Sequence, residues 1–325
     1  MLKATITILC IFVFYPGLSQ KKIFSTEEQA ILDSILKDDE FFKMLKKELG
    51  PKSYFLAQVT AGNTYFSLMN KRINASHLES KFTISPSVSY MNKSGFGVMA
   101  MASLSNFERG FDIYQSNISP SFALLKNKRI SASISYTRFF TNRKYENIIS
   151  PIKNDLYLTC YLKKLWLQPG VSVGFSSGRN RMLNRIDTVL LGIQRKFIDT
   201  VTTTLKAFSL NAFIQHSFEY YELLGKKDAI SISPKLLLNA GSNNYEEIHK
   251  NPYVTFIQKN TRRKNFGRLQ DNTSFQFQSV ALNLDINYLI GKFGIEPQAY
   301  FDYYIPETTD THFTTVYSVT LSYTF

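Results

Sequence analysis

The sequence predicts an all-β protein: a transmembrane, antiparallel, up-and-down β-barrel of about twelve strands with an N-terminal helix. From Tyr54 to the C-terminus, apolar and polar residues alternate with a period of two, as in strands whose two faces meet different media. No run of about 18 apolar residues follows the start of the chain, which excludes a helical membrane protein. Short and long connections alternate between the candidate strands, as in barrels that cross a membrane.

The composition agrees with this fold class. The 325 residues include 27 Phe and 19 Tyr, which suit strands and the aromatic girdles of membrane barrels. The formal net charge of +13 fits a surface that meets phosphate-bearing lipid head groups. Aromatic residues are too few among the basic runs for a nucleic-acid platform, so no nucleic-acid partner is expected.

Residues 1–19 have the layout of a secretory signal peptide. Lys3 forms a short basic region, an apolar stretch runs from Ala4 to Phe14, and Ser19 is a small residue before the expected cleavage site. An uncleaved anchor is the alternative, although the apolar stretch is shorter than a membrane span. After cleavage Cys160 is the only cysteine, so we expect no intramolecular disulfide, no cysteine-based metal site and no cofactor.

Residues 20–51 contain the expected helix. Ser25 and Glu28 form a capping-box pattern, apolar residues recur at helical spacing up to Leu49, and Gly50-Pro51 ends the helix. Two placements are open: the helix lies on the periplasmic membrane surface, or it plugs the barrel. Its apolar stripe favours the membrane surface.

Residues 52–325 form the expected barrel. Both of its ends are expected on the periplasmic side, so the strand number is even. Twelve is the prediction, with ten or fourteen as alternatives. The stretch from Thr188 to Thr203 either adds two strands, which would give fourteen, or extends its neighbours. The expected strands lie near 54–66, 81–91, 95–104, 111–124, 129–141, 155–163, 165–176, 205–222, 228–241, 275–290, 293–304 and 313–325.

The last strand ends the chain on an aromatic residue. Its odd positions from Tyr317 to Phe325 are apolar or aromatic, and its even positions are Ser or Thr. This pattern resembles the β-signal, the terminal strand of Gram-negative outer-membrane barrels. The resemblance implies an outer-membrane location. It also implies outer-membrane lipids, including lipopolysaccharide, and the β-barrel assembly machinery as partners. The oligomeric state is not implied.

Charged residues within the strands are the candidates for the lumen. An ionised side chain that faces hydrocarbon costs a few kcal/mol, so we expect these side chains to point inward. The cluster is either a structural plug or the constriction of a narrow, acidic pore that prefers cations. A non-enzymatic narrow pore, transporter or structural surface protein is therefore the expected function. The residues are Arg138, Glu219, Lys235, Asp285, Glu296 and Asp302.

Basic residues gather in two of the expected outer loops. They favour contact with anionic lipid or a polyanion, which would suit an adhesin or a lipid-binding surface protein. Ordinary solvated loops are the alternative. The residues are Arg179, Arg181, Arg262, Arg263 and Lys264.

A surface hydrolase is a further possibility. Outer-membrane phospholipases resemble this chain in strand number, but their His-x-Ser pair is missing here. Asp310-Thr311-His312 resembles the Asp-x-His of omptin proteases, whose facing Asp-x-Asp is also missing. Asp310 and His312 would be the catalytic residues of such a hydrolase, whereas the main prediction has neither a catalytic nor a metal site. The helix and twelve strands also look like the translocator end of autotransporters, in layout alone.

Overall fold

The computed structural model describes residues 52–70, 75–107, 110–125, 127–146, 149–190, 193–225, 228–249, 274–306 and 312–325. The expected signal peptide and N-terminal helix fall in residues 1–51, outside the described residues. Within the part that is described, no helix is long and apolar enough to cross a bilayer.

The described chain is built almost entirely of strands, because its period-two alternation suits a sheet with two different faces. A short 3-10 helix, η1 (Arg143–Tyr145), follows the fifth strand. The strands are β1 (Tyr54–Asn70), β2 (Ala75–Met91), β3 (Phe96–Phe107), β4 (Gly110–Ala123), β5 (Ile130–Thr141), β6 (Asn154–Leu162), β7 (Gln168–Leu190), β8 (Ile193–Gln215), β9 (Phe218–Tyr221), β10 (Asp228–His249), β11 (Gln276–Ile290), β12 (Phe293–Tyr304) and β13 (Phe313–Thr324).

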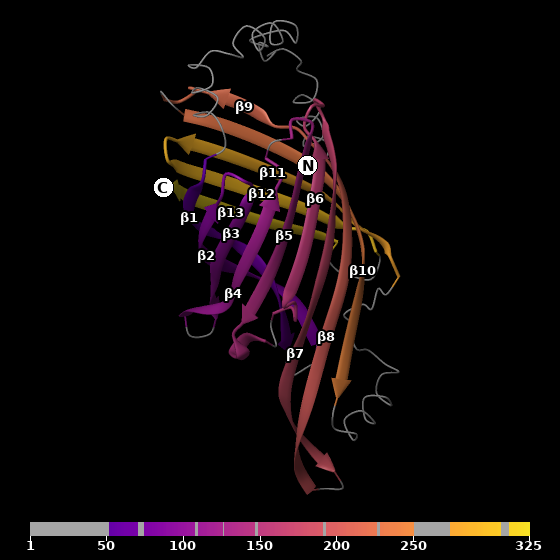
Figure 1. The fold of residues 1–325 in the computed structure, drawn as a ribbon. Coiled ribbons are helices and arrows are strands. Elements are labelled where there is room, and N and C mark those ends of the chain that lie inside the picture. Colours follow the sequence, from indigo (N-terminus) through magenta and orange to yellow (C-terminus); the bar gives the residue numbers. More distant parts are fainter. Residues whose placement is uncertain are drawn as a thin grey trace, which may run out of the picture. The chain divides into compact units, whose positions relative to one another are not determined.

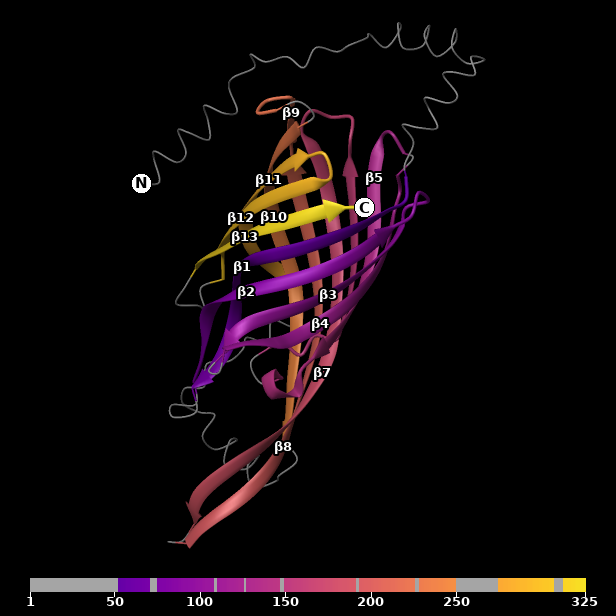
Figure 2. The same cartoon turned by 90° about the vertical axis from the view of Figure 1, so that its left-hand side faces the viewer.

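The strands close into an antiparallel barrel, seen in Figures 1 and 2. Except at β8, which pairs with β10, each strand pairs with the next, and β13 returns to pair with β1, with Val59 opposite Leu321. β9 pairs only with β10, which also pairs with β8 and β11, so the wall has twelve positions. The expected number of twelve strands is confirmed.

The hairpin of β7 and β8 is longer than the rest of the wall. Each of its strands has 23 residues, against 12 in β5. The stretch from Thr188 to Thr203 lies within this hairpin, so it extends two strands and adds none. Figures 1 and 2 show the hairpin projecting beyond its neighbours at one end of the barrel.

The outer face of the barrel is apolar and the inner face is polar. On β5, Ile134 and Tyr136 lie outside with 42% and 41% of their surface exposed, whereas Thr137 faces inward and bonds to Ser119 at 2.8 Å. Large side chains such as Val88 and Leu321 are more than half exposed on the outer face. Such a continuous apolar surface belongs in lipid. The chain is therefore a β-barrel of the outer-membrane type, which crosses the bilayer with strands.

The two ends of the barrel differ in their connections. One end, called here the short-turn end, carries the turns at 92–95, 124–129, 163–167 and 291–292, and β1 begins and β13 ends there. Gly95 and Gly291 have positive φ values of 98° and 59°, which these tight turns require and which glycine adopts without strain. The opposite end is called the long-loop end.

The seam between the first and last strands is reinforced by a side chain. The ladder between β1 and β13 reaches from Leu56 to Gly62. Just beyond it, the Asn63 amide donates to the carbonyl of Thr315 at 3.0 Å and accepts from the backbone N–H of Tyr317 at 2.6 Å. Asn63 thus continues the seam with its side chain.

Candidate functional site in the barrel lumen

The charged part of the lumen is the wall formed by β9 to β12. Lys235, on β10, is opposite Asn283 on β11, and Asn283 is opposite Tyr300 on β12. Asp285 lies two residues from Asn283, opposite Ser233 and Gln298, and therefore on the same face. Strand alternation thus brings one lysine and several acids to a common inner surface.

Acidic side chains predominate on this wall. Glu296 is two residues from Gln298, which makes it a diagonal neighbour of Asp285 on the adjacent strand. Asp302 lies on the same face of β12, nearer the long-loop end, opposite Ala281 and Thr314. Two ionised carboxylates at diagonal positions disfavour each other unless a proton, water or a cation lies between them.

Lys235 is held by an aromatic ring. Its Nζ lies 5.0 Å from the centre of the Phe213 ring on β8, a cation–π distance. Gly170 on β7 makes room for this ring, because a Cβ there would come within 2.3 Å of the Phe213 side chain. The ring therefore lies against the wall, with the ammonium group over it.

A belt of uncharged polar groups begins on this wall closer to the long-loop end and continues onto β8 and β6. The Asn239 amide donates to Ser279 at 2.9 Å and to the Tyr300 hydroxyl at 3.4 Å. Asn211 is opposite Asn239 on β8 and donates to the Tyr157 hydroxyl at 3.3 Å. These groups offer amide and phenol hydrogen bonds to whatever occupies the lumen.

Several oxygen atoms of the lumen have no protein partner within the described residues. They include Oδ1 of Asn283, Asp285 and Asp302 on β11 and β12, and Oδ1 of Asn117 on β4. Buried oxygens of this kind are normally satisfied by ordered water or a bound solute. The residues that carry these oxygens are half-buried on β11 and β12 and buried on β4.

The loop at 142–153 folds inward at the long-loop end. Tyr145 of η1 is 3% exposed and stacks on Phe107 of β3 at 4.3 Å between ring centres. On the other side, the Asn180 amide of β7 donates to the carbonyl of Glu146 at 2.9 Å. A Cβ at Gly178 would come within 1.9 Å of the Pro151 carbonyl, so glycine permits this close approach. The loop is thus tied to both sides of the entrance.

A small polar cluster holds the outer side of this loop. Asp112 accepts from Lys144 Nζ at 2.9 Å and from the Tyr145 hydroxyl at 2.7 Å. Hydrogen bonding with Tyr145, followed by that with Asp112, raises the pKa of Lys144 above its ordinary value. The ammonium also lies 5.0 Å from the centre of the Tyr145 ring.

Five of the six expected lumen residues face the lumen. Lys235, Asp285, Glu296 and Asp302 lie together on the wall formed by β10 to β12. Glu219, on β9 opposite Ser231, is exposed at the short-turn end, where its carboxylate accepts from the Tyr221 hydroxyl at 2.7 Å.

The expectation that Arg138 faces the lumen is wrong. Arg138 is exposed on the outer face, in the same alternation as Ile134 and Tyr136, and donates to Oδ1 of Asn154. The assumption that charge must face inward holds only at the depth of the hydrocarbon, and Arg138 lies near the long-loop end, beyond Ile134 and Tyr136, with only Phe140 farther out on the same face of β5.

The residues expected for a hydrolase or for a basic outer surface are only partly described. His312 Nδ1 lies 3.0 Å from the carbonyl of Tyr304, and Asp310 is outside the described residues. Arg179 and Arg181 are exposed on the outer face of β7, whereas Arg262, Arg263 and Lys264 fall outside the described residues. Within the described part, no group of three or more His, Cys, Asp or Glu side chains is arranged to hold a metal ion.

Sequence patterns did not predict the polar belt or the inward loop. Asn239, Asn211, Tyr157 and Tyr300 carry no charge, whereas the residues expected in the lumen were all charged. Their odd or even positions along each strand, which decide whether a side chain faces the lumen or the membrane, would have identified them. The position of the loop depends on the contact of Tyr145 with Phe107, far away in sequence, and carries no comparable local signal.

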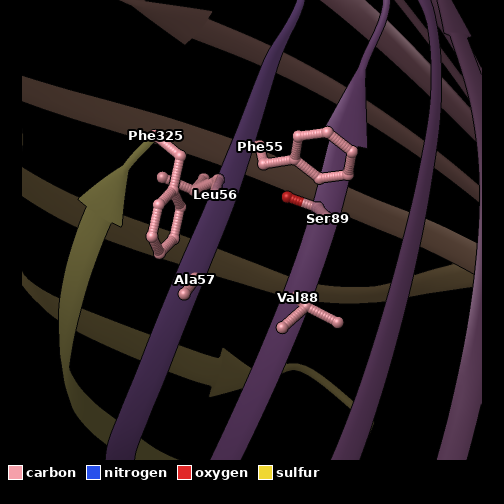
Figure 3. Close-up of a pocket in the computed structure, with 6 residues that line it drawn as sticks. All are labelled: Phe55, Leu56, Ala57, Val88, Ser89 and Phe325. Atoms are coloured by element: carbon pink, nitrogen blue, oxygen red, sulfur yellow. The ribbon is translucent and has the colours of Figure 1, made fainter.

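A shallow apolar groove of about 370 Å³ lies at the seam, near the short-turn end. Figure 3 shows its lining, in which Phe55, Leu56 and Ala57 of β1 lie between Phe325 and residues Val88 and Ser89 of β2. The backbone N–H of Phe325 donates to the carbonyl of Phe55 at 2.9 Å, which fixes the C-terminal residue against β1. The groove offers few polar groups, so the lumen is the better candidate site.

No sequence-family model and no curated protein sequence matches the chain. Among solved structures, the NanC porin has 9% identity and a TM-score of 0.37, over 82% of this chain and 98% of that one. The KdgM porin has 11% identity and a TM-score of 0.40, over 83% and 99%. The β domain of the Bordetella autotransporter BrkA has 9% identity and a TM-score of 0.38, over 84% and 100%. The barrel architecture itself is established by the strand pairing of this chain.

Proposed function

We propose that this protein is a non-enzymatic, narrow, water-filled pore of the outer membrane that prefers cations. The observation that carries the proposal is the inner wall of β9 to β12. There, Glu219, Asp285, Glu296 and Asp302 face the lumen with Lys235, and carboxylate oxygens of Asp285 and Asp302 have no described protein partner. Acids lining a narrow aqueous passage raise the local concentration of cations and lower that of anions.

The width of the passage supports a pore for small solutes. Barrels of eight strands are filled by their side chains, whereas barrels of sixteen or more hold a wide channel, so twelve positions leave a narrow lumen. Gly170 lets the Phe213 ring lie flat against the wall, and the inward loop at 142–153 reduces the entrance at the long-loop end. Small hydrophilic cations and uncharged polar solutes are the proposed permeants.

The test is the reversal potential of the purified protein in a planar lipid bilayer under a salt gradient. We expect a potential of the sign that marks cation preference, and we expect the double variant Asp285→Asn, Glu296→Gln to move it toward zero. Thr320→Ser, opposite Glu296 on β13, is the matched control and should leave it unchanged. Anion preference, or an absence of conductance in correctly folded protein, contradicts the proposal.

The N-terminal segment requires its own measurement. A helix on the periplasmic membrane surface predicts the same conductance with and without residues 20–50. A plug predicts a larger conductance after the deletion. The apolar stripe of this segment supports the membrane-surface placement.

A further inference from the structure

A ladder of residues crosses the outer face of β5 to β10 at one level near the long-loop end. Arg138 is opposite Asn154, Asn154 is opposite Ser177, Ser177 is opposite Lys206, and Lys206 is opposite Asn244. Arg138 and Lys206 are exposed, and both follow the alternation of the outward side chains on their strands. This polar level is called the outer rung.

The level just below the outer rung is apolar. Tyr136, Leu156, Phe175 and Phe208 lie opposite one another there, each between 39% and 49% exposed. On β6 to β8 the outer rung therefore begins where the apolar face ends, whereas on β5 one more aromatic side chain, Phe140, lies beyond Arg138 and is 50% exposed. In a membrane barrel this change marks the passage from hydrocarbon to head groups, where aromatic side chains gather.

Three cations surround the centre of the outer rung. Arg138 and Lys206 are three strands apart, roughly 14 Å at about 4.8 Å per strand, with Asn154 and Ser177 between them. Arg179 lies two residues beyond Ser177 on the same face and is exposed. Long basic side chains at these positions can converge on one anion above Asn154 and Ser177.

Neutral donors complete the arrangement. Oδ1 of Asn154 already accepts from the Tyr136 hydroxyl, at 2.8 Å, and from Arg138. This orientation leaves the amide nitrogen of Asn154 to donate, together with the Ser177 hydroxyl. The nearest acid by register is Glu246, opposite Thr204, which is itself opposite Arg179. By register the position of Glu246 is diagonal to that of Lys206, and it lies on the far side of Arg179 from Asn154.

We infer that the outer rung binds the phosphate of a lipid head group. The site offers hydrogen-bond donors from two arginines, a lysine and two neutral side chains, which is more than a phosphodiester can accept. It therefore favours a phosphomonoester, as found in phosphatidic acid or a phosphorylated glycolipid. The acyl chains of that lipid lie over the apolar level formed by Tyr136, Leu156, Phe175 and Phe208. The site is on the opposite face of the wall from the lumen, and it is independent of the proposed pore.

The test uses a local reporter of lipid composition. Trp166 is the only tryptophan of the chain, so Trp166→Phe with Phe175→Trp places a single tryptophan directly below the outer rung. The protein is reconstituted in phosphatidylcholine nanodiscs containing a minor fraction of brominated phosphatidic acid or of brominated phosphatidylcholine. We expect phosphatidic acid to be enriched at this tryptophan by at least about fivefold, since each cation near the surface contributes about that factor.

Two controls separate a site from general attraction. Phe313→Trp in the same Trp166→Phe background reports on the aromatic end of β13 and should show no enrichment. The triple variant Arg138→Gln, Arg179→Gln, Lys206→Gln should remove the enrichment at position 175, with an unchanged far-ultraviolet spectrum as evidence of folding. Equal quenching by the two brominated lipids at position 175, equal enrichment at position 313, or enrichment that persists in the triple variant overturns the inference.

Discussion

The outer faces of β5–β8 and of β12–β13 follow the same alternation but end differently at the long-loop end. The first face passes from Tyr136 and Phe175 to the cations of the outer rung, with Phe140 as the one aromatic side chain of β5 beyond Arg138. The second ends in aromatic side chains, with Tyr303 opposite Phe313 and 54% and 59% of these side chains exposed. Aromatic side chains suit the boundary itself, whereas cations reach beyond it to phosphate. The rim of this barrel therefore presents two different chemistries to the membrane.

The largest expected effect comes from placing a cation too deep on the first face. Leu158→Arg puts a charge in the middle of the apolar face of β6 and should lower the free energy of unfolding by about 3 kcal/mol. Ser177→Arg places the same side chain in the outer rung, where the cost should stay below about 1 kcal/mol. Urea titration of vesicle-refolded protein, followed by Trp166 fluorescence, measures both. Equal costs would show that the outer rung does not mark the boundary of the hydrocarbon.

A smaller effect is expected at the seam, on the second face. Asn63→Ala removes the bonds to the Thr315 carbonyl and the Tyr317 N–H and should cost about 1–2 kcal/mol, because two hydrogen bonds across the seam are lost. Ser80→Ala, which removes only an exposed bond to Asn63 of 3.2 Å, is the control and should cost less. An Asn63→Ala barrel as stable as its parent would mean that the ladder alone holds the seam.

The smallest effect concerns the polar cluster at β4, between the two faces. In Asp112→Asn the pKa of Lys144 should fall toward its ordinary value, because the ammonium loses an ionised acceptor. A lysine whose pKa is raised by folding stabilises the fold at pH values below its unfolded pKa, and this contribution is lost as the pH rises through the folded pKa. Amide exchange in η1 should therefore be faster in the variant at neutral pH, with the difference disappearing in strong base. A Lys144 titration that is unchanged in the variant would contradict this account.

Sequence patterns predicted the barrel because alternation is local. The parity of Leu282 and Leu284 assigns Asp285 to the lumen without knowledge of the neighbouring strands, and the same rule places Lys235, Glu296 and Asp302. Arg138 was assigned wrongly because its charge was given more weight than its parity. The ladder that joins Arg138, Ser177 and Lys206 could not be predicted, because register between distant strands depends on the whole wall.

The inward loop has a consequence for the route of any solute. The loop at 142–153 is anchored on Phe107 of β3 and on Asn180 of β7, so it occupies the β3–β7 side of the entrance. In the proposed pore, the described part of this loop would direct a molecule arriving from the long-loop end toward the opposite side. That side is formed by β10 to β13, and Asp302 is the first of its acids on the way toward Asp285 and Glu296. Selection by charge would then begin near the mouth and continue along one flank of the barrel.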